Sequence, residues 1–294
     1  MRLVLPAPAK INLHLRITAI LESGMHELDT SFAYVDVTDS LCFEPAADLA
    51  VGCSVPELAG PDNLVYKVLA ALRNRYGIRD GLHVHIDKRI PAQAGLGGGS
   101  SDAATAIIAA NRLWQLGMPL DAMIEFAAPY GADIPCFLFG QASQAHGIGE
   151  KLQSYDKPMP AGSALLAWPG TGLSTAAVFR HFDHSEAGRT LTLPGATDTM
   201  RRGPARLGEN DLEAAACALS PALARLLQHL RKHSQQAWMS GSGSACVALF
   251  DESGEASAMA SQLQERGLAS WTHAGRLLDT HPARDNNDWG VAKR

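Results

Sequence analysis

The feature that most constrains this chain is the run Gly95-Leu-Gly-Gly-Gly99, which is followed by Ser100-Ser101-Asp102 and a helical pattern. Four glycines in five positions let the backbone approach a ligand closely. The helix behind them offers unpaired N–H groups and the positive end of its dipole, and the two serines can cap it or donate to phosphate oxygens. The segment therefore predicts a phosphate-binding loop, with a flexible, well-capped loop as the alternative.

The loop does not match the common phosphate motifs. A P-loop has Lys after its last glycine, whereas Gly99 is followed by Ser100. A dinucleotide-binding fingerprint that starts at Gly95 would need a glycine where Ser100 stands. The signature blocks of protein kinases are also missing from the sequence. The chain therefore carries a different kind of phosphate loop.

Hydrophobic periodicity predicts a mixture of strands and helices. Residues 9–18 alternate, which predicts a half-buried strand with Ile11 and Leu13 facing the core and with Lys10 and Asn12 together on the opposite face. Further strands are predicted at residues 32–37, 82–87, 142–148, 164–168, 237–239, 246–250 and 271–274. Helices are predicted at residues 64–76, 101–116, 120–128, 211–219, 221–232 and 255–266.

The chain length and one cluster of turn residues indicate two domains. At roughly 150 residues per domain, 294 residues allow about two. Pro158, Pro160 and Gly162 mark a junction. We therefore expect an α+β protein with mixed and antiparallel sheets and flanking helices, divided into residues 1–157 and 158–294. Two polar stretches, residues 184–208 and 285–294, are expected to be a loop and a loose tail.

Charge, cysteines and hydropathy exclude several classes of protein. With 25 Lys and Arg against 30 Asp and Glu, the net charge is −5, which does not indicate nucleic-acid binding. The five cysteines have the spacing of neither a zinc cluster nor a disulfide framework. No apolar run approaches the ~18 residues of a membrane span, and the N-terminal apolar stretch is too short for a signal peptide. We expect a cytoplasmic protein without nucleic-acid or membrane partners.

Lys10 and Asp133 are the next candidates for chemistry. Lys10 lies on the polar face of the first predicted strand, and Asp133 lies in the short corner Gly131-Ala-Asp-Ile-Pro135. Phosphoryl transfer needs a group that orients and deprotonates a hydroxyl, and positive charge near the moving phosphate. A carboxylate beside a lysine would serve both needs, and the lysine would keep the carboxylate ionised. A solvated lysine and a turn aspartate are the alternative interpretation.

Other polar groups have simpler interpretations. His26 by itself is typical of a surface or capping histidine. Two histidine pairs have a spacing that metal ligands can use, although no third ligand is evident: His83/His85 and His181/His184. A second glycine–serine turn, residues 240–244, is either a tight connection between strands or a second backbone nest for an anion.

Several segments together resemble one family. The loop 91–102, Pro8-Ala-Lys10-Ile-Asn12-Leu and Met239-Ser-Gly-Ser-Gly-Ser244 resemble the three motifs of the GHMP kinases. Five further segments resemble the branch of that family whose substrate is a methylerythritol joined to cytidine diphosphate. They are Gly24-Met-His-Glu-Leu28, Ile86-Asp-Lys-Arg-Ile-Pro91, Gly131-Ala-Asp-Ile-Pro135, Gly147-Ile-Gly-Glu150 and Asn210-Asp-Leu-Glu213. The resemblance covers most of the chain and implies the two-domain fold of this family.

The resemblance implies roles for individual residues. Lys10 and Asp133 match the catalytic lysine and aspartate: Asp133 would accept the proton of the substrate hydroxyl, and Lys10 would orient it and stabilise charge. The residues that match the ATP phosphate loop are Pro91, Ala92, Gln93, Ala94, Gly95, Leu96, Gly97, Gly98, Gly99, Ser100 and Ser101. The residues that match the site for the cytidine diphosphate end are Asn12 and His26, with Phe179 as the aromatic that stacks on cytosine and Phe32 and Thr175 nearby.

One position departs from the pattern of this branch. The branch usually has Gly-Tyr-His where this chain has Gly24-Met25-His26, and that tyrosine stacks on the other face of cytosine. Methionine can contact a ring through its thioether, but it is less rigid. We therefore expect Met25 to belong to the substrate site and to give weaker or differently shaped stacking.

The resemblance also implies a reaction. ATP and Mg²⁺ would be the cofactors, with Ser100 or Ser101 as candidate metal ligands, and the γ-phosphate would pass to the 2-hydroxyl of the methylerythritol in the non-mevalonate isoprenoid pathway. Two alternatives stay open: another GHMP small-molecule kinase, of the mevalonate or homoserine type, and a non-catalytic nucleotide-binding regulator. Affinity for cytidine separates the first alternative from the favoured one, and ATP binding without ADP formation would indicate the second.

Overall fold

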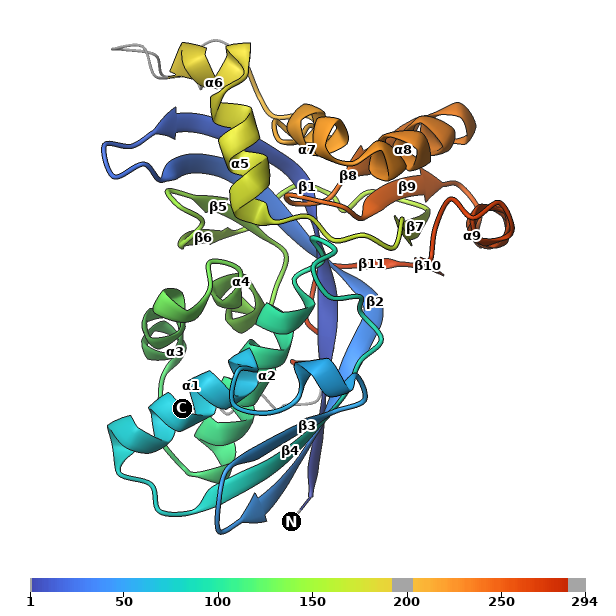
Figure 1. Ribbon diagram of the computed structural model, residues 1–294. Helices are drawn as coiled ribbons and strands as arrows, with labels where there is room; N and C mark the ends of the chain where they lie inside the picture. The colour runs from blue at the N-terminus through green and yellow to red at the C-terminus, as the bar shows by residue number, and fades with distance from the viewer. Residues whose placement is uncertain (1, 192–202, 285–294) are drawn as a thin grey trace.

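The computed structural model describes residues 2–191 and 203–284. Over these residues the chain forms two lobes, and two long strands, β1 (Leu3–Ile20) and β2 (His26–Ala46), run through both (Figure 1). Much of the predicted polar loop, residues 192–202, and the predicted tail, residues 285–294, lie outside the described residues. Among the described residues, no helix combines the length and the hydrophobicity that crossing a membrane requires.

The larger lobe is a mixed sheet with helices packed on it. The strand order is β3-β4-β2-β5-β6, and β1 and β11 also pair with β2. All pairings are antiparallel except the parallel pair β3–β4. The strands are β3 (Ala50–Cys53), β4 (Gly81–Asp87), β5 (Ser143–His146), β6 (Lys151–Ser154) and β11 (Leu277–Leu278). The helices are α1 (Leu64–Tyr76), α2 (Gly98–Leu113), α3 (Leu120–Ala127) and α4 (Ile134–Phe139), with short 3₁₀ turns at Pro56–Leu58 and Ala128–Tyr130.

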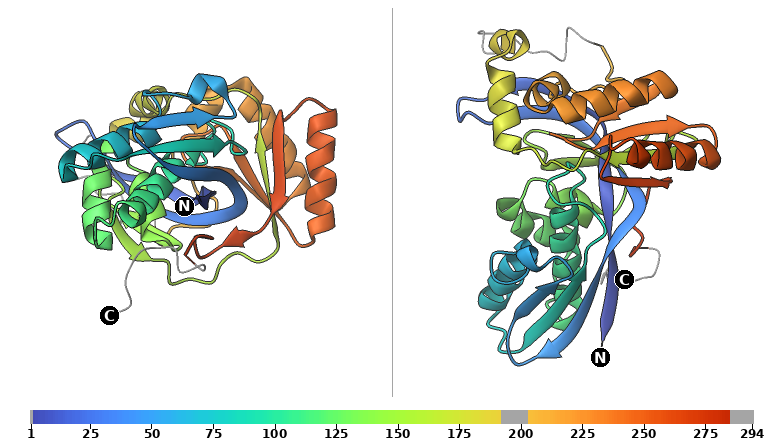
Figure 2. Two further views of the ribbon diagram at one scale, coloured as in Figure 1. Left: turned by 90° about the horizontal axis from the view of Figure 1, so that it is seen from below. Right: turned by 45° about the vertical axis from the view of Figure 1, so that its right-hand side comes forward.

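The smaller lobe is an antiparallel sheet in the order β10-β7-β9-β8, with helices around it (Figure 2). Its strands are β7 (Ser163–Trp168), β8 (Gln236–Met239), β9 (Cys246–Phe250) and β10 (Trp271–Gly275). Its helices are α5 (Thr175–Asp183), α6 (Glu186–Leu191), α7 (Glu213–Leu219), α8 (Pro221–His233) and α9 (Ser253–Glu265). The predicted α+β class is confirmed, although α6 occupies part of the stretch predicted to be a loop.

The alternation of the first strand predicted that it is half-buried, but both of its faces are buried. Its apolar side chains are buried, and so are the polar residues on the other face: Lys10 is only 2% exposed and Arg16 only 6%. The reason is that β1 lies between the lobes and is covered on both sides. The polar side chains stay because partners from β2 and from the segment around Glu209 satisfy them.

The helix behind the glycine run also differs from its prediction. It begins at Gly98 rather than Ser101, because Gly97 adopts the left-handed conformation that turns the chain into the helix. It has no solvent face in its middle, since every residue from Ser101 to Asn111 is buried. Helices α1 and α4 and strand β1 all pack against it, so the predicted apolar stripe covers only part of its buried surface.

Helix α1 shows where local signals suffice. It spans the predicted residues, Leu64–Tyr76. Asn63 caps its start by accepting a hydrogen bond from the backbone N–H of Val65 at 2.8 Å, and Gly77 ends it in the left-handed conformation.

The structure has three hydrophobic clusters among the described residues, one in each lobe and one between the lobes. One fills the larger lobe and one the smaller lobe. The third lies between them and combines Ile11 and Leu13 of β1 with Leu96, Leu166 and Trp238. The strands β1–β6 precede residue 157 and β7–β10 follow it, but β11 returns to the larger sheet. A boundary at residue 157 stays a prediction.

Candidate active site

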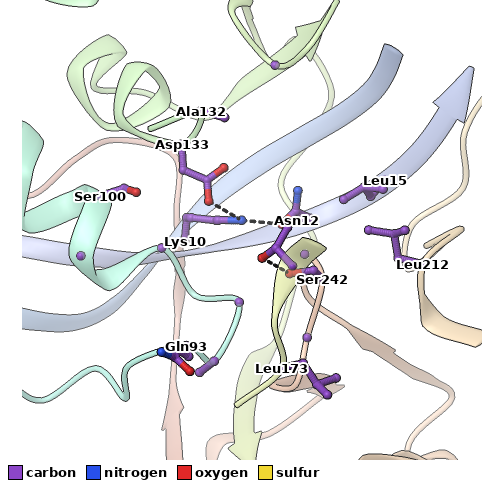
Figure 3. Close-up of a pocket in the computed structure, with 18 of the residues that line it drawn as sticks. Lys10, Asn12, Leu15, Gln93, Ser100, Ala132, Asp133, Leu173, Leu212 and Ser242 are labelled. Carbon is purple, nitrogen blue, oxygen red and sulfur yellow. Dashed lines mark hydrogen bonds and ion pairs between the residues drawn. The ribbon is translucent and has the colours of Figure 1, made fainter. Parts of the chain in front are cut away.

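A cleft of about 660 Å³ lies where the lobes meet. Strands β1 and β2, the glycine-rich loop, the corner before α4, the start of α5 and the second glycine–serine turn all contribute to its walls (Figure 3). Lys10 and Asp133 lie in its centre, with the glycine-rich loop and Ser100 on one side and Leu173, Leu212 and Ser242 on the other.

Lys10 and Asp133 meet, although they are far apart in the sequence. The Lys10 Nζ lies 3.4 Å from the Asp133 Oδ2 and donates a hydrogen bond to the Asn12 Oδ1 at 2.7 Å (Figure 3). The Lys10 side chain is 3% exposed, whereas that of Asp133 is 38% exposed and open to the cleft. The ammonium group also lies 5.3 Å from the centre of the Phe32 ring. A hydroxyl that enters the cleft can thus meet a carboxylate beside a fixed positive charge.

The glycine-rich loop is held in place by backbone contacts. The Leu96 carbonyl accepts from the Lys10 N–H at 2.9 Å, and the Ala94 carbonyl accepts from the Ala245 N–H at 2.8 Å. Gly97 has a φ of +71°, and a Cβ there would lie 2.8 Å from the Phe137 ring. The glycines therefore permit close packing in a loop that backbone hydrogen bonds hold on both sides.

Most of the predicted phosphate loop faces the cleft. Residues 91–95 and 97–100 line it, and the first residues of α2 bring the unpaired backbone N–H groups of a helix start to its wall. Two predicted residues lie elsewhere. Leu96 belongs to the cluster between the lobes, and Ser101 is fully buried, with a hydroxyl that has no partner in the described part of the chain.

The residues predicted for the cytidine diphosphate end divide into two groups. Asn12, Phe32, Thr175 and Phe179 line the cleft. Met25 and His26 do not line it, and Met25 is 51% exposed in the connection between β1 and β2.

His26 lies behind the cleft wall. Its ring packs on Phe179 with the ring centres 4.5 Å apart, and its Nε2 lies 2.6 Å from the Asp183 Oδ1. His26 therefore touches a residue of the cleft wall through its side chain without lining the cleft itself.

Several residues of the site were assigned no role from the sequence. Thr30 accepts from the Asn12 side-chain amide at 2.9 Å and donates to the His14 carbonyl at 2.6 Å, so it fixes Asn12 from the neighbouring strand. Leu15, Leu28 and Leu212 form an apolar wall. Only the sheet register and the packing of α7 place these side chains here, because their types are ordinary for strands and helices.

A buried charged cluster lies beneath the glycine-rich loop. The Lys88 Nζ donates to the Asp102 Oδ2 at 2.8 Å and also to Asp39, whose other oxygen accepts from the backbone N–H groups of Arg89 and Ile90. Burial raises the pKa of Asp102 to about 7 against the opposing attraction of Lys88, and the carboxylate of Asp39 adds to the rise. The cluster ties β2 to both ends of the loop. Lys88 lies in a segment of the family resemblance, but Lys88 itself was assigned no role.

The second glycine–serine turn also reaches the cleft. Gly241, Ser242 and Gly243 line it, and the Ser242 hydroxyl lies 2.9 Å from that of Thr175. The turn is therefore more than a connection between strands. In the described residues, no group of three or more His, Cys, Asp or Glu side chains is placed to hold a metal ion.

Comparison with known families identifies the kind of protein. Residues 63–141 match the GHMP kinases N terminal domain, and residues 177–269 match the GHMP kinases C terminal. The 4-diphosphocytidyl-2-C-methyl-D-erythritol kinase of Bordetella parapertussis is 37% identical over 280 residues, which cover 94% of this chain and 91% of that protein. The protein of the same name from Dechloromonas aromatica is 36% identical over 94% of this chain and 97% of its own.

The chain belongs to the 4-diphosphocytidyl-2-C-methyl-D-erythritol kinase family.

A solved structure agrees with this membership. The crystal structure of a 4-(cytidine 5'-diphospho)-2C-methyl-D-erythritol kinase superposes with a TM-score of 0.76 at 33% identity and covers 94% of this chain and 99% of its own. The two-lobed fold is thus the GHMP kinase fold, and the chain is a small-molecule kinase. The family implies ATP as the phosphoryl donor.

Proposed function

We propose that this kinase transfers the γ-phosphate of ATP to the 2-hydroxyl of 4-diphosphocytidyl-2-C-methyl-D-erythritol and releases the 2-phosphate and ADP. The names of the relatives support this substrate. The observation that carries the proposal is the position of the Lys10–Asp133 pair. It lies in one cleft between a phosphate loop and the wall that holds Phe179.

Lys10 and Asp133 are the proposed catalytic residues. Asp133 accepts a hydrogen bond from the attacking hydroxyl and takes its proton as the bond to phosphorus forms. Lys10 orients Asp133 and the hydroxyl and stabilises the negative charge that spreads over the transferred group. A loose transition state asks for positioning and positive charge more than for a strong base, which is what a buried ammonium group held by Asn12 supplies.

The two ends of the cleft hold the two substrates. The glycine-rich loop and the start of α2 bind the phosphates of ATP through backbone N–H groups. At the other end Phe179 stacks on the cytosine, with Phe32 and Thr175 beside it. Asn12 lies between Lys10 and Thr30 and contacts the diphosphate side of the substrate. His26 fixes Phe179 from behind.

The nucleotide brings the magnesium ion. The Ser100 hydroxyl is an oxygen donor at the cleft wall, and oxygen is the ligand type that Mg²⁺ takes, so this residue fits the ion. The ion would neutralise charge on the β- and γ-phosphates when bound. Ser101 is not proposed as a ligand, because its side chain is fully buried.

The proposed function has a direct test. ADP release is measured with Mg-ATP and 4-diphosphocytidyl-2-C-methyl-D-erythritol, with mevalonate and homoserine as parallel acceptors. We expect turnover with the cytidylyl substrate alone. Turnover with another acceptor would keep the kinase and reject the cytidine site. If folded protein that still binds ATP releases no ADP with any acceptor, the result would indicate a non-catalytic nucleotide-binding protein.

The departure at Met25 has its own test. Met25→Tyr restores the residue that the family pattern has at this position, and we propose that it tightens cytosine stacking and lowers the KM for the cytidylyl substrate several-fold, since an aromatic stack adds about 0.5–1.5 kcal/mol. The KM for ATP serves as the internal control. Unchanged affinity for the cytidylyl substrate would reject this role. Met25 is exposed and does not line the cleft, so that outcome would show that this residue lies outside the cytosine site.

We also propose a domain boundary near residue 157 and a cytosolic location. A division near residue 157 is supported by the two separate family matches on either side of it. A cytosolic location in a reducing compartment is supported by the five free cysteines.

A further inference from the structure

The segment Asn210-Asp-Leu-Glu213 carries part of the family resemblance but has no role in the reaction described so far. It lies beside the cleft, along the edge of β1 that does not pair with β2. Leu15 and Asn210 form a parallel bridge. The Leu15 N–H donates to the Glu209 carbonyl at 2.8 Å, and the Asp211 N–H donates to the Leu15 carbonyl at 3.0 Å. The backbone of this segment is therefore fixed to the strand that carries Lys10.

The side chain of Asn210 reaches from this fixed backbone to the second glycine–serine turn. Its Nδ2 donates to the Met239 carbonyl at 2.8 Å and to the Gly241 carbonyl at 2.9 Å. Its Oδ1 accepts from the Leu212 N–H at 3.0 Å. One N–H group of the amide is thus used on the turn and the other on the last residue of β8 before it, and only a side chain with two donors and one acceptor can make all three hydrogen bonds.

The turn that Asn210 holds lies directly against the catalytic lysine. A Cβ on Gly241 would lie 3.5 Å from the Lys10 Nζ and 3.4 Å from the Asn12 Oδ1. The Ser240 hydroxyl accepts from the Asn12 N–H and donates to the Gly95 carbonyl, both at 3.2 Å. A shift of the turn would therefore move one wall around the ammonium group and loosen one support of the phosphate loop.

We infer that Asn210 is a positioning residue for phosphoryl transfer: it holds the turn at residues 240–244 against Lys10 and so keeps the ammonium group in place beside Asp133. Without the amide donors the Met239 and Gly241 carbonyls lose this partner, and the turn loses its link to the segment fixed on β1, although the Ser240 hydroxyl still accepts from the Asn12 N–H. This inference rests on the proposed function for its kinetic consequence. The position of the turn can be measured independently of catalysis.

The test compares Asn210→Asp and Asn210→Ala with the wild-type kinase, and uses Asp211→Asn as the matched control. The aspartate keeps the acceptor for Leu212 but loses both donors and places a negative charge against two carbonyl oxygens. Asp211 lies in the same segment, but its carboxylate accepts from the Ile17 N–H instead of binding the turn. We measure kcat and both KM values, the thermal midpoint, and the hydrogen exchange of residues 240–245.

We expect kcat per folded molecule to fall by between about tenfold and a hundredfold in both Asn210 variants, because small displacements of catalytic groups have effects of this size. The KM values should change by less than kcat does. Amide exchange should accelerate in the turn, where the Gly243 N–H donates to the Ser240 carbonyl and the Ala245 N–H to the Ala94 carbonyl. Asp211→Asn should leave both kcat and this exchange unchanged.

Two results would overturn the inference. The first is a kcat within about twofold of the wild type in a folded Asn210 variant, even with a lowered thermal midpoint, which would leave Asn210 a purely structural role. The second is unchanged exchange in the turn. If Asn210→Asp fails to fold, Asn210→Ala, which adds no charge, decides. If the wild-type kinase itself shows no turnover, the proposed function fails, and the exchange measurement still tests whether Asn210 holds the turn.

Discussion

At the scale of single residues, the polar side chains of β1 explain why a strand buried on both faces is stable. An ammonium group out of water is costly unless it is paired and hydrogen-bonded. Lys10 forms an ion pair with Asp133 and donates a hydrogen bond to Asn12. The side-chain amide of Asn12 in turn donates to the Thr30 hydroxyl. The same contacts that make the burial of Lys10 tolerable also fix it beside Asp133 in the cleft.

Replacing either member of the pair should strongly lower turnover without unfolding the kinase. We expect Lys10→Ala and Asp133→Asn each to lower kcat by at least about a hundredfold, since each removes charge or proton transfer at the reacting group. ADP release measures the loss, and circular dichroism and ATP affinity serve as controls for folding. Turnover close to wild type in either variant would reject the role of that residue.

The raised pKa of Asp102 predicts a pH dependence of stability. Folding raises the pKa of the Asp102 carboxyl from its ordinary value of 3.8 to about 7. The carboxyl therefore loses its proton near pH 4 in the unfolded chain and near pH 7 in the folded one. Between these values the folded state holds more protons, so the free energy of unfolding should fall as the pH rises from about 4 to about 7. Urea unfolding of the wild type and of Asp102→Asn gives the difference, and a difference that is flat with pH would contradict the prediction.

At the scale of elements, the glycine-rich loop is a fixed structure. It is bonded to β1 through Lys10 and to the second turn through Ala245, and the Lys88 cluster beneath it joins its two ends. The close approach of Gly97 to Phe137 and Lys10 means that the loop, the helix α4 and the strand β1 share one packing arrangement.

Two glycines of the loop should respond differently to a methyl group. Gly97→Ala should lower the free energy of unfolding by roughly 1–3 kcal/mol, because the new Cβ meets Phe137 and the backbone is left-handed. Gly99→Ala is the matched control, because a Cβ there meets nothing within 4 Å and alanine favours a helix. Urea unfolding compares them, and equal stability of the two variants would show that the packing at Gly97 adapts.

At the scale of the whole molecule, the lobes share their longest elements. Strands β1 and β2 run through both, and the cluster around Ile11, Leu13 and Trp238 lies between them. The cleft therefore has walls from two sheets, whose relative position is held by a hydrophobic core and not by a linker.

This sharing predicts that the two lobes unfold together. Leu13→Ala should lower the free energy of unfolding by about 2–5 kcal/mol, since Leu13 is 1% exposed in the shared cluster. Far-ultraviolet circular dichroism and tryptophan fluorescence should still report one coincident transition. Two separate transitions, with only one shifted by the substitution, would show that the lobes are independent.

How much the sequence predicts depends on the range of the interactions involved. The bounds of α1 follow from Asn63 and Gly77, and the strand at Cys246–Phe250 follows from its short apolar run. A glycine-rich loop before a helix follows from its glycines and the pattern behind them, and the family resemblance led to the branch that the comparisons confirm. These features rest on neighbours within a few positions of the chain, or on patterns of residues along it.

Only the tertiary structure decided which distant residues meet. The sheet register and the packing of the lobes bring Asp133 to Lys10 and Asn210 to Gly241. The same packing leaves Met25 outside the cleft and buries Asp102 until its pKa rises. The pattern of one strand predicts which side chains share a face, but burial and charge depend on what the rest of the molecule places against that face.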